Sequence, residues 1–501
     1  MSYKYIGIPK SISYRACCEN DNVFAPSKYT RFLPQNDKLF VPLSSVCQES
    51  KSKISFNRKE MYAYSEIGDI DVSNGTIDYH NYYGIDLPSD NPKSCKKGDI
   101  LVSTVRTYRG GVGLLSYELE NHCCSPAILI IRNIIDERIT KEYLLAVLRT
   151  DFFTEQILGF QTRGMYPRLD SDAMDKVVVP IPHNKDVIKF VSLVSTAYQN
   201  KYELIRKRHA AIIKLIEKEL IENQKPNTFS YNLPRLNEVK EVGRLDASLY
   251  KEFFKGNLHL VLNYKNGYSP LTEQDLTLIP GPSLELRLLG TRIDSDHFIN
   301  GFYRLITPKQ ITNYGIIKNE EFIGTPAKIA KIQYGDILFG ESGTGRTMVY
   351  LDKDNNTINN AHAHILRTRR DNDLERVITI RSILQYYKEI GITDCMTVGG
   401  SGGHLSPSYF DRIMIPEFPK IKKKEIAELY YNPQNIQLQN LSLDNFIAKD
   451  DEFNKRAGIY ELDKIAKLMK KVLDKTIDDI VNERPVNIKL CFEEIENQEE
   501  P

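Results

Sequence analysis

The stretch that decides the fold is residues 186–223, which read DVIKFVSLVSTAYQNKYELIRKRHAAIIKLIEKELIEN. It contains neither glycine nor proline, and apolar or ring residues recur every three or four positions from Val187 to Leu220, the spacing of one helix face. Asp186 is a suitable N-cap, and Pro226 stops the run. At about 1.5 Å per residue the helix would be about 55–60 Å long. Because ordinary globular helices are shorter, we expect it to pack against a partner helix and to separate two bodies.

The chain on the two sides of this stretch follows one plan twice. Gly98-Asp99-Ile100-Leu101 matches Gly335-Asp336-Ile337-Leu338, and LDSDAMDKVVVP (169–180) matches LSPSYFDRIMIP (405–416). The two matches are separated by 237 and 236 residues, so the register holds across each half. Between these landmarks each half also has a helical stretch and then a glycine-containing loop. Coincident matches at one separation predict a duplicated domain.

The fold class that these patterns predict is mixed α/β (α+β). Short apolar and β-branched runs, bounded by Gly, Asn, Asp and Pro, indicate strands in both halves. The expected domains are a globular body at 1–183, the long helix at 184–226, a second body at 227–420, and a helical region with a polar tail at 421–501. The two bodies would be related by an internal pseudo-twofold duplication.

The last region predicts a second set of helices. A short helix is expected at 422–431, a break at Asn432-Pro433-Gln434-Asn435, and a long amphipathic segment from about Asp450 to Glu483. Two long helices in one chain can pair antiparallel as a coiled coil.

Composition bounds the function. The chain has 501 residues, 27% of them charged, with a net charge of +1, so any nucleic-acid binding must come from local basic patches. The eight cysteines include two vicinal pairs but no CxxC spacing, which favours reduced thiols in a cytoplasmic protein. No apolar run approaches about 18 residues, and the N-terminus lacks the apolar region of a signal peptide, so no membrane span is expected.

Three histidines are candidate metal ligands. His209 lies in the seam of the long helix, where no second metal-type residue shares its turn, so we expect a packed core histidine. Ala361-His362-Ala363-His364 would place both histidines on one face of a strand, but no third ligand is near in the sequence. No metal site is therefore predicted.

One string resembles a nucleotide-binding loop. Residues 340–347, GESGTGRT, fit the phosphate-loop spacing, but Arg346 stands where the lysine belongs. A phosphate loop also needs a helix directly after it, whereas Met348-Val349-Tyr350-Leu351-Asp352 predicts a strand. Asn432-Pro433-Gln434-Asn435 lacks the second proline and the aromatic residue of an amino-methyltransferase motif. We find no nucleophile elbow and no HExxH, so the chain is predicted to be non-catalytic and to bind no cofactor itself.

Loops that combine Arg, Tyr, Gly and small hydroxyls stand at corresponding places in the two halves. Arginine binds guanine edges or clamps phosphate, and glycine lets a backbone approach a groove closely. These loops are the predicted DNA contacts. The candidates are Arg106, Tyr108, Arg109, Arg163, Tyr166 and Arg168 in the first half, and Ser342, Arg346, Thr347, Ser401 and His404 in the second.

Taken in order, these motifs resemble the specificity (S) subunit of a type I restriction-modification system. The resemblance rests on the two Gly-Asp-Ile-Leu strings with their glycine-bearing loops, the two Leu-to-Pro segments, the long helix, and Gly243-Arg244-Leu245-Asp246-Ala247-Ser248-Leu249-Tyr250. It covers about residues 25–430. It implies that each body is a target recognition domain that binds one half of a bipartite site in double-stranded DNA. The two helices would form an antiparallel coiled coil that sets the spacer between the half-sites.

The resemblance also implies partners. Two methyltransferase (modification) subunits would dock on the helices, and two ATP-driven restriction and translocase subunits would complete the assembly. S-adenosylmethionine, ATP and Mg would bind to those partners and not to this chain.

The sequence departs from the family pattern and leaves alternatives open. The first half opens on Phe24-Ala25-Pro26-Ser27-Lys28-Tyr29 instead of a clear Arg-Leu-Asp-Ala string, and the region after Pro416 is not a simple copy of the long helix. A non-catalytic scaffold, or the recognition subunit of a related phage-defence system, is the main alternative. A DNA mimic would need an acidic excess, which a net charge of +1 does not provide. A P-loop-like NTPase is the distant alternative.

Overall fold

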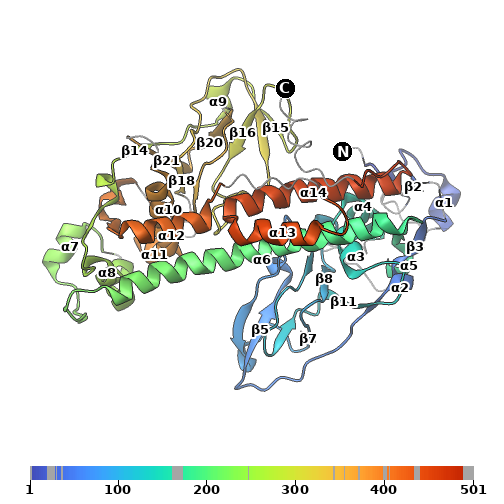
Figure 1. Ribbon diagram of the computed structural model, residues 1–501, viewed down its shortest axis with the longest axis horizontal. Coiled ribbons are helices and arrows are strands. Elements are labelled where there is room, and N and C mark those ends of the chain that lie inside the picture. Colours follow the sequence, from blue (N-terminus) through green and yellow to red (C-terminus); the bar gives the residue numbers. More distant parts are fainter. Residues whose placement is uncertain are drawn as a thin grey trace. The chain divides into compact units, whose positions relative to one another are not determined.

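The structure is a computed structural model that describes residues 3–19, 29, 31–34, 36, 38–160, 173–245, 247–341, 345–354, 356–369, 373–398, 403–405, 407–433 and 441–488. It divides into two compact units. Unit 1 comprises Met1–Glu203, Asn435–Lys455 and Leu462–Pro501, and unit 2 comprises Leu204–Gln434 and Arg456–Glu461. The predicted long helix is α6 (Lys185–Glu222), drawn in green in Figure 1. Its first half belongs to unit 1 and its second half to unit 2.

Unit 1 is built on two four-stranded sheets. The first, called sheet 1a, is antiparallel, and its order is β4 (Cys47–Glu49), β11 (Ile128–Ile134), β8 (Ile100–Ser103), β9 (Val112–Leu114). The second, sheet 1b, has the order β6 (His80–Tyr83), β5 (Met61–Ser65), β10 (His122–Cys124), β7 (Lys93–Ser94), with β5 and β10 parallel. Buried residues of both sheets, Leu101, Cys124, Ile128 and Ile130 among them, pack into one core.

Shorter elements complete unit 1. β1 (Ile6–Gly7) pairs with β2 (Arg31–Phe32), and β3 (Phe40–Pro42) pairs with β12 (Val178–Pro180). The helices other than α6 are α1 (Tyr14–Glu19), α2 (Leu43–Val46), α3 (Lys141–Leu148), α4 (Asp151–Phe160), α5 (Ala173–Lys176), α13 (Phe446–Arg456, up to Lys455) and α14 (Ile459–Val481, from Leu462).

Unit 2 has the same frame. Its sheet 2a has the order β14 (Leu276–Ile279), β21 (Ala363–Thr368), β18 (Ile337–Gly340), β19 (Thr347–Val349). Its sheet 2b has the order β15 (Ile293–Ser295), β17 (Glu321–Gly324), β16 (Tyr303–Ile306), β20 (Thr357–Asn359). β13 (Tyr268–Pro270) pairs with β22 (Met414–Pro416). The helices are α7 (Leu236–Val242), α8 (Glu252–Leu262), α9 (Leu286–Leu289), α10 (Leu374–Glu389), α11 (Ile392–Met396) and α12 (Lys420–Tyr430).

The two units repeat each other strand by strand. Sheet 1a and sheet 2a have the same order and the same antiparallel pairing. Each second sheet contains one parallel pair of strands, β5 and β10 in sheet 1b and β16 and β20 in sheet 2b. An antiparallel strand flanks the first member of each pair: β6 lies beside β5, and β17 lies beside β16. Among the strands that the structure describes, β15 has no counterpart in sheet 1b and β7 has none in sheet 2b. The predicted mixed α/β class and its internal duplication are therefore confirmed.

The Gly-Asp-Ile-Leu strings repeat for a physical reason. Gly98 and Gly335 have φ of +85° and +86°, where a side chain would be strained. The aspartate that follows each glycine is buried and accepts two hydrogen bonds from one arginine: Arg132 donates to Asp99 at 3.0 and 2.8 Å, and Arg367 donates to Asp336 at 2.8 and 2.7 Å. Each turn thus fixes the start of the strand, β8 or β18, that leads to a candidate loop.

The long helix packs as its pattern predicts, and it also makes polar contacts with α10 and α14. The side chains of Ile205, Ile212, Ile216 and Leu220 are buried. His209 is also buried, but its Nε2 lies 2.5 Å from Glu389 Oε1 on α10, so it is a paired histidine and not only a packed one. In unit 1, α14 runs antiparallel to α6, because Tyr198 interacts electrostatically with Asp474 and Tyr202 with Asp463.

The predicted helix from Asp450 to Glu483 is wrong in its extent. α13 ends at Arg456, and α14 begins at Ile459. Gly458 lies in the break, where a Cβ atom would stand 2.7 Å from the backbone of Tyr430 and Tyr431. The Gly458 amide donates to Glu461 Oε2 at 2.9 Å, which caps the start of α14. Close contact with the end of α12 therefore requires a glycine where a helix would otherwise continue.

Two further predictions concern cysteines and membranes. The seven cysteines that the structure describes are free thiols. None of the described helices is long and apolar enough to cross a membrane.

His122 gives sheet 1b a dependence on pH. Its ring is buried, stacks on Tyr117 at 5.8 Å, and places Nε2 3.0 Å from Ser65 Oγ. Burial lowers the pKa of His122 from 6.5 to about 4. Between pH 6.5 and pH 4, His122 therefore binds a proton in the unfolded chain but not in the folded chain. The free energy of unfolding should consequently fall by about 3 kcal/mol as the pH drops from 6.5 to 4.

Urea unfolding at a series of pH values checks this prediction. His122→Gln keeps a hydrogen-bonding group beside Ser65 and should remove the part of the slope between pH 6.5 and 4 that His122 contributes. The matched control is His183→Gln, at an exposed position outside the sheets, measured over the same pH series. A His122→Gln variant with the slope of the original chain would contradict the prediction.

Candidate nucleic-acid interface

The β8–β9 loop of unit 1 carries three of the predicted DNA contacts. Arg106 adopts a left-handed conformation with φ of +52°, and a 3-10 turn follows at Thr107–Arg109. Thr107 is buried and donates Oγ1 to Ser103 O at 2.6 Å, which holds the loop against the end of β8. Arg106 and Tyr108 are half-buried, and Arg109 is exposed. The loop is therefore braced from within and presents Arg109 to solvent.

The equivalent loop of unit 2 joins β18 to β19. The Gly340 amide donates to Arg346 O at 2.9 Å, and Arg346 Nη1 donates to Ile311 O at 3.2 Å. Thr347 is fully buried and donates Oγ1 to Arg381 O on α10 at 3.2 Å, so this predicted contact faces the protein interior. Ser342 lies outside the described residues. Because strand β19 and not a helix follows the loop, the phosphate-loop interpretation lacks the helix N-terminus that it requires.

The second predicted loop of unit 2 lies against the first. Val398 and His404 close it with reciprocal backbone hydrogen bonds of 2.8 and 2.9 Å. The amide of the next residue, Leu405, donates to Glu341 O at 3.2 Å, beside the β18–β19 loop. His404 is exposed. The structure thus brings the two candidate loops of unit 2 together, although about sixty positions separate them in the sequence.

Several candidates cannot be placed. Arg163, Tyr166, Arg168 and Ser401 lie outside the described residues.

The prediction for His362 and His364 is wrong in its geometry. β21 begins at Ala363, so His362 lies in the preceding turn and is exposed, whereas His364 is buried. His364 Nε2 lies 3.3 Å from Glu341 Oε2, and its ring contacts Phe410 edge-on. Among the residues that the structure describes, no group of three or more His, Cys, Asp or Glu side chains could hold a metal ion.

Sequence analysis missed an arginine that holds unit 1 to its long helix. Arg149, after α3, donates Nη1 to Val112 O on β9 at 2.7 Å and Nη2 to Ser73 O at 3.2 Å. Its guanidinium lies 5.8 Å from the ring centre of Tyr198 on α6. Gly75, with φ of +75°, leaves room for it, since a Cβ there would stand 1.9 Å from Nη1. We call Gly75, Arg149 and Tyr198 latch 1.

Unit 2 repeats this arrangement as latch 2, formed by Gly315, Arg381 and Tyr430. Arg381 on α10 donates Nε to Thr347 O at 2.9 Å and Nη2 to Asn313 O at 3.0 Å. It lies 4.9 Å from the ring centre of Tyr430 on α12. A Cβ on Gly315, whose φ is +78°, would stand 2.5 Å from its Nη2. Both latches bind the first residue of the strand that follows a candidate loop, so they fix where that loop returns to the sheet.

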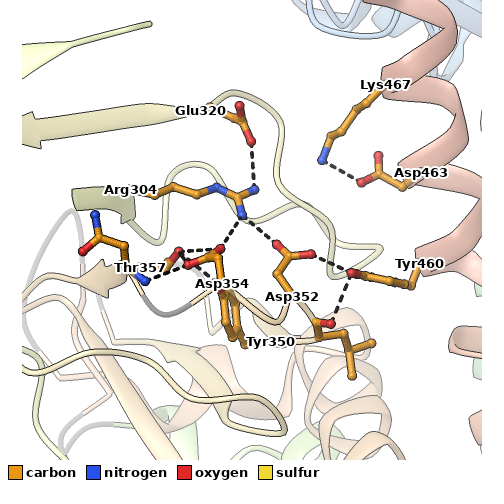
Figure 2. A network of polar contacts seen from close by, with 11 residues as sticks. Arg304, Glu320, Tyr350, Asp352, Asp354, Thr357, Tyr460, Asp463 and Lys467 are labelled. Carbon is orange, nitrogen blue, oxygen red and sulfur yellow. Dashed lines mark hydrogen bonds and ion pairs between the residues drawn. The ribbon is translucent and has the colours of Figure 1, made fainter. Parts of the chain in front are cut away.

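Unit 2 has a further polar network at its second sheet (Figure 2). Arg304 on β16 pairs with Asp352 at 2.6 Å and with Glu320 at 2.9 Å. Tyr460, in the first turn of α14, donates to Asp352 Oδ1 at 2.6 Å and to Leu351 O at 3.2 Å. Burial, and then Asp352, raises the pKa of Tyr460, so it stays a neutral donor. The network ties the first turn of α14 to sheet 2b.

The chain is similar in sequence to one curated protein and in fold to several solved structures. No model of a known protein family matches the chain. A curated match confirms the resemblance to specificity subunits of type I restriction enzymes. It is the HindI specificity subunit of Haemophilus influenzae, 24% identical over 167 residues that cover 32% of this chain and 35% of the relative. The chain thus spans about a third of the length of the curated relative it matches.

Solved structures of the same class are also similar. One is the S subunit of a type I restriction-modification system from M. genitalium, with 13% identity, 89% of this chain and 98% of that chain covered, and a TM-score of 0.38. Another is the HsdS subunit from Thermoanaerobacter tengcongensis, with 18% identity, 88% and 96% covered, and a TM-score of 0.31.

Proposed function

We propose that this chain is the DNA-recognition subunit of a type I restriction-modification complex. In this proposal each unit binds one half of a bipartite site in double-stranded DNA, and residues 1–183 and 227–420 are the two target recognition domains. The observation that carries the proposal is the repeated frame: an Asp–Arg turn at the start of one strand, a candidate loop at its end, and a latch on the strand that returns. The curated relative supports the same function.

The chemistry of the loops suits DNA better than a small substrate. Arg109 and His404 are exposed side chains whose own backbone groups are held by hydrogen bonds, from the Arg109 amide to Arg106 O and between His404 and Val398. A fixed backbone limits the entropy lost on binding, and such side chains can contact base edges and phosphates. Arg163, Tyr166, Arg168, Ser342 and Ser401 lie outside the described residues and belong to the same proposal by their positions in the sequence. Arg106, Tyr108 and Arg346 are half-buried and would support or extend the contact.

The partners in this proposal are two methyltransferase subunits, docked on the helices, and two restriction and translocase subunits. S-adenosylmethionine, ATP and Mg would act on those partners, and this chain would supply specificity without catalysis. A cytoplasmic location, with access to DNA, belongs to the same proposal.

The helices after α12 favour a second candidate function. The region after α12 is divided into α13 and α14, and is not a copy of α6. This division favours, as the alternative, the recognition subunit of a related phage-defence system with different partners.

Single-molecule sequencing of adenine methylation in a host that expresses the chain with its neighbouring methyltransferase tests the proposal. We expect a bipartite motif that disappears when this chain is omitted. Replacing residues 25–183 with those of another member of the class should change one half-site and leave the other, because each unit has its own frame. An active methyltransferase that produces no such motif, or a swap that leaves both half-sites unchanged, would contradict the proposal.

A further inference from the structure

The basic side chains of this chain differ in whether they have partners. The run Lys420-Ile421-Lys422-Lys423-Lys424-Glu425 is rich in lysine, yet Lys422 pairs with Glu425 at 2.7 Å, Lys423 with Glu417 at 3.4 Å, and Lys424 with Glu428 at 3.7 Å. Charges paired in this way attract a polyanion weakly, because each of these three cations already has a neighbouring anion. The most basic run of the chain is therefore a poor candidate for binding phosphate.

A second basic stretch, in unit 1, has no such partners. Residues 51–60, KSKISFNRKE, join β4 to β5 and hold four cations and one anion. Lys51, Lys53, Arg58 and Lys59 are all exposed. Across the part of the chain that the structure describes, none of these four side chains forms an ion pair or a hydrogen bond. We call residues 51–60 the basic segment.

The backbone of the basic segment is held in place. Its first part lies along β7, where the Ser94 amide donates to Ser52 O at 2.9 Å and the Ile54 amide to Pro92 O at 3.2 Å. Its second part is a turn at Asn57, whose amide donates to Tyr62 Oη at 2.9 Å. The turn packs so closely on Gly84 that a Cβ there would stand 2.1 Å from Asn57 O. Four unpaired cations are thus presented from an ordered backbone.

The neighbouring strand adds groups that can bind nucleic acid. β6 is an edge strand of sheet 1b, and the amide of Ile85, just after it, donates to Arg58 O at 3.1 Å. His80, Asn81 and Tyr83 of β6 are exposed. Imidazole, amide and phenol groups can bind phosphates, sugars or base edges. β6 therefore adds such groups beside Arg58 and Lys59, whereas Lys51 and Lys53 lie along β7, at the other edge of the same sheet.

The counterpart in unit 2 lacks this property. The segment between β14 and β16, the strands equivalent to β4 and β5, also carries exposed arginines. Arg287 pairs there with Glu285 at 2.5 Å, and Arg292 pairs with Asp294 at 2.9 Å. The unpaired positive charge is therefore a property of unit 1 at this position.

We propose that the basic segment, with β6, is a surface of unit 1 that binds the phosphate backbone of duplex DNA. The proposal rests on the function proposed above and adds to it an anchor that is independent of base sequence. The segment supplies affinity, and the candidate loops supply specificity. Its counterpart in unit 2 makes no equivalent contact, so the two units hold DNA unequally.

The experiment compares the assembled complex, methyltransferase subunits included, with and without the four cations. The variant is Lys51→Gln, Lys53→Gln, Arg58→Gln and Lys59→Gln together, which leaves the backbone contacts in place. Binding is measured at several salt concentrations to a duplex that carries the methylated motif and to one that does not. Each lost phosphate contact lowers the slope of log K against log salt by about 0.9, so we expect a decrease of about 3 to 4. Affinity for both duplexes should fall at least tenfold at 0.1 M salt, with an unchanged methylation motif.

Arg287→Gln with Arg292→Gln is the matched control and should leave the slope unchanged, because both arginines are already paired. An unchanged slope in the fourfold variant overturns the inference. If the fourfold variant does not assemble with methyltransferase, and its own DNA binding keeps an unchanged slope, the inference is also overturned. The surface would then be assigned to a protein partner. A complex that shows no motif in any form contradicts the proposed function instead. In that case the slope on the duplex without the motif still decides whether the basic segment binds phosphate.

Discussion

Replacing Arg381 with alanine is expected to lower the free energy of unfolding of unit 2 by about 3–5 kcal/mol. Arg381 is fully buried, and its hydrogen bonds satisfy the carbonyl groups of Thr347 and Asn313. Alanine would leave both carbonyls without that donor and would open a cavity against Tyr430. The buried charge itself costs free energy, since burial lowers the pKa of Arg381. Arg381→Met, which fills the space without a charge, should therefore cost less than alanine.

Arg149→Ala in latch 1 is the matched comparison. Arg149 is half-buried, so water can replace part of what its side chain provides, and we expect a loss of about 1–3 kcal/mol in unit 1. Urea unfolding, with hydrogen exchange to assign the loss to one unit, measures both variants. A loss below about 1 kcal/mol for Arg381→Ala would show that latch 2 does not hold unit 2 together.

Asp450→Ala is expected to destabilise unit 1 by a similar amount, about 3–5 kcal/mol. Asp450 on α13 pairs with Lys201 on α6, and both side chains are almost completely buried. Lys201 also donates to Asn454 Oδ1 at 2.6 Å and lies 5.0 Å from the ring centre of Phe453. Burial lowers the pKa of Lys201, and removing the carboxylate would leave the ammonium group without its counter-charge.

The triple variant Lys201→Met, Asp450→Leu, Asn454→Leu distinguishes the effect of the buried charges from that of the packing around them. Apolar side chains of similar volume avoid the cost of burying charge, so the triple variant should regain most of the stability lost in Asp450→Ala. Asp444→Ala is the control, because Asp444 pairs with Lys189 on the same helix but in solvent, and no measurable loss is expected. A triple variant as unstable as Asp450→Ala would mean that the buried charges themselves stabilise α13 on α6.

Local sequence patterns were enough to predict the long helix, the duplication and the strand after Arg346. The absence of glycine and proline in 186–223 predicted a helix that the structure places at Lys185–Glu222. The repeated Gly-Asp-Ile-Leu strings predicted the duplication, because a positive φ and a buried carboxylate leave few alternatives at those two positions. The strand after Arg346 followed from its β-branched and aromatic residues.

Contacts between distant residues could not be predicted in the same way. Lys201 is fully buried, but a hydrophobic pattern counts lysine as polar, and Asp450 is 249 residues away. The glycines of the two latches stand in dissimilar strings, Ser73-Asn74-Gly75 and Asn313-Tyr314-Gly315, so no repeat was visible there. Helical periodicity also continued through Gly458, whose role depends on close contact with the end of α12.

The candidate loops were found by composition, and composition does not report burial. Thr347 shares the hydroxyl chemistry of its neighbours but faces α10. Lys51, Lys53, Arg58 and Lys59 were passed over because a sequence shows charge and not whether a charge is paired.

The Asp–Arg turns also make each unit usable as a display scaffold. In unit 1 the ion pair of Asp99 and Arg132 stands at the start of β8, and the candidate loop begins at its end, four residues or about 13 Å away. A library that randomises residues 104–106 and 108–109 would leave that pair, buried Thr107 and latch 1 in place. New binding properties could then be selected in one half of the chain while the other half stays as an internal standard.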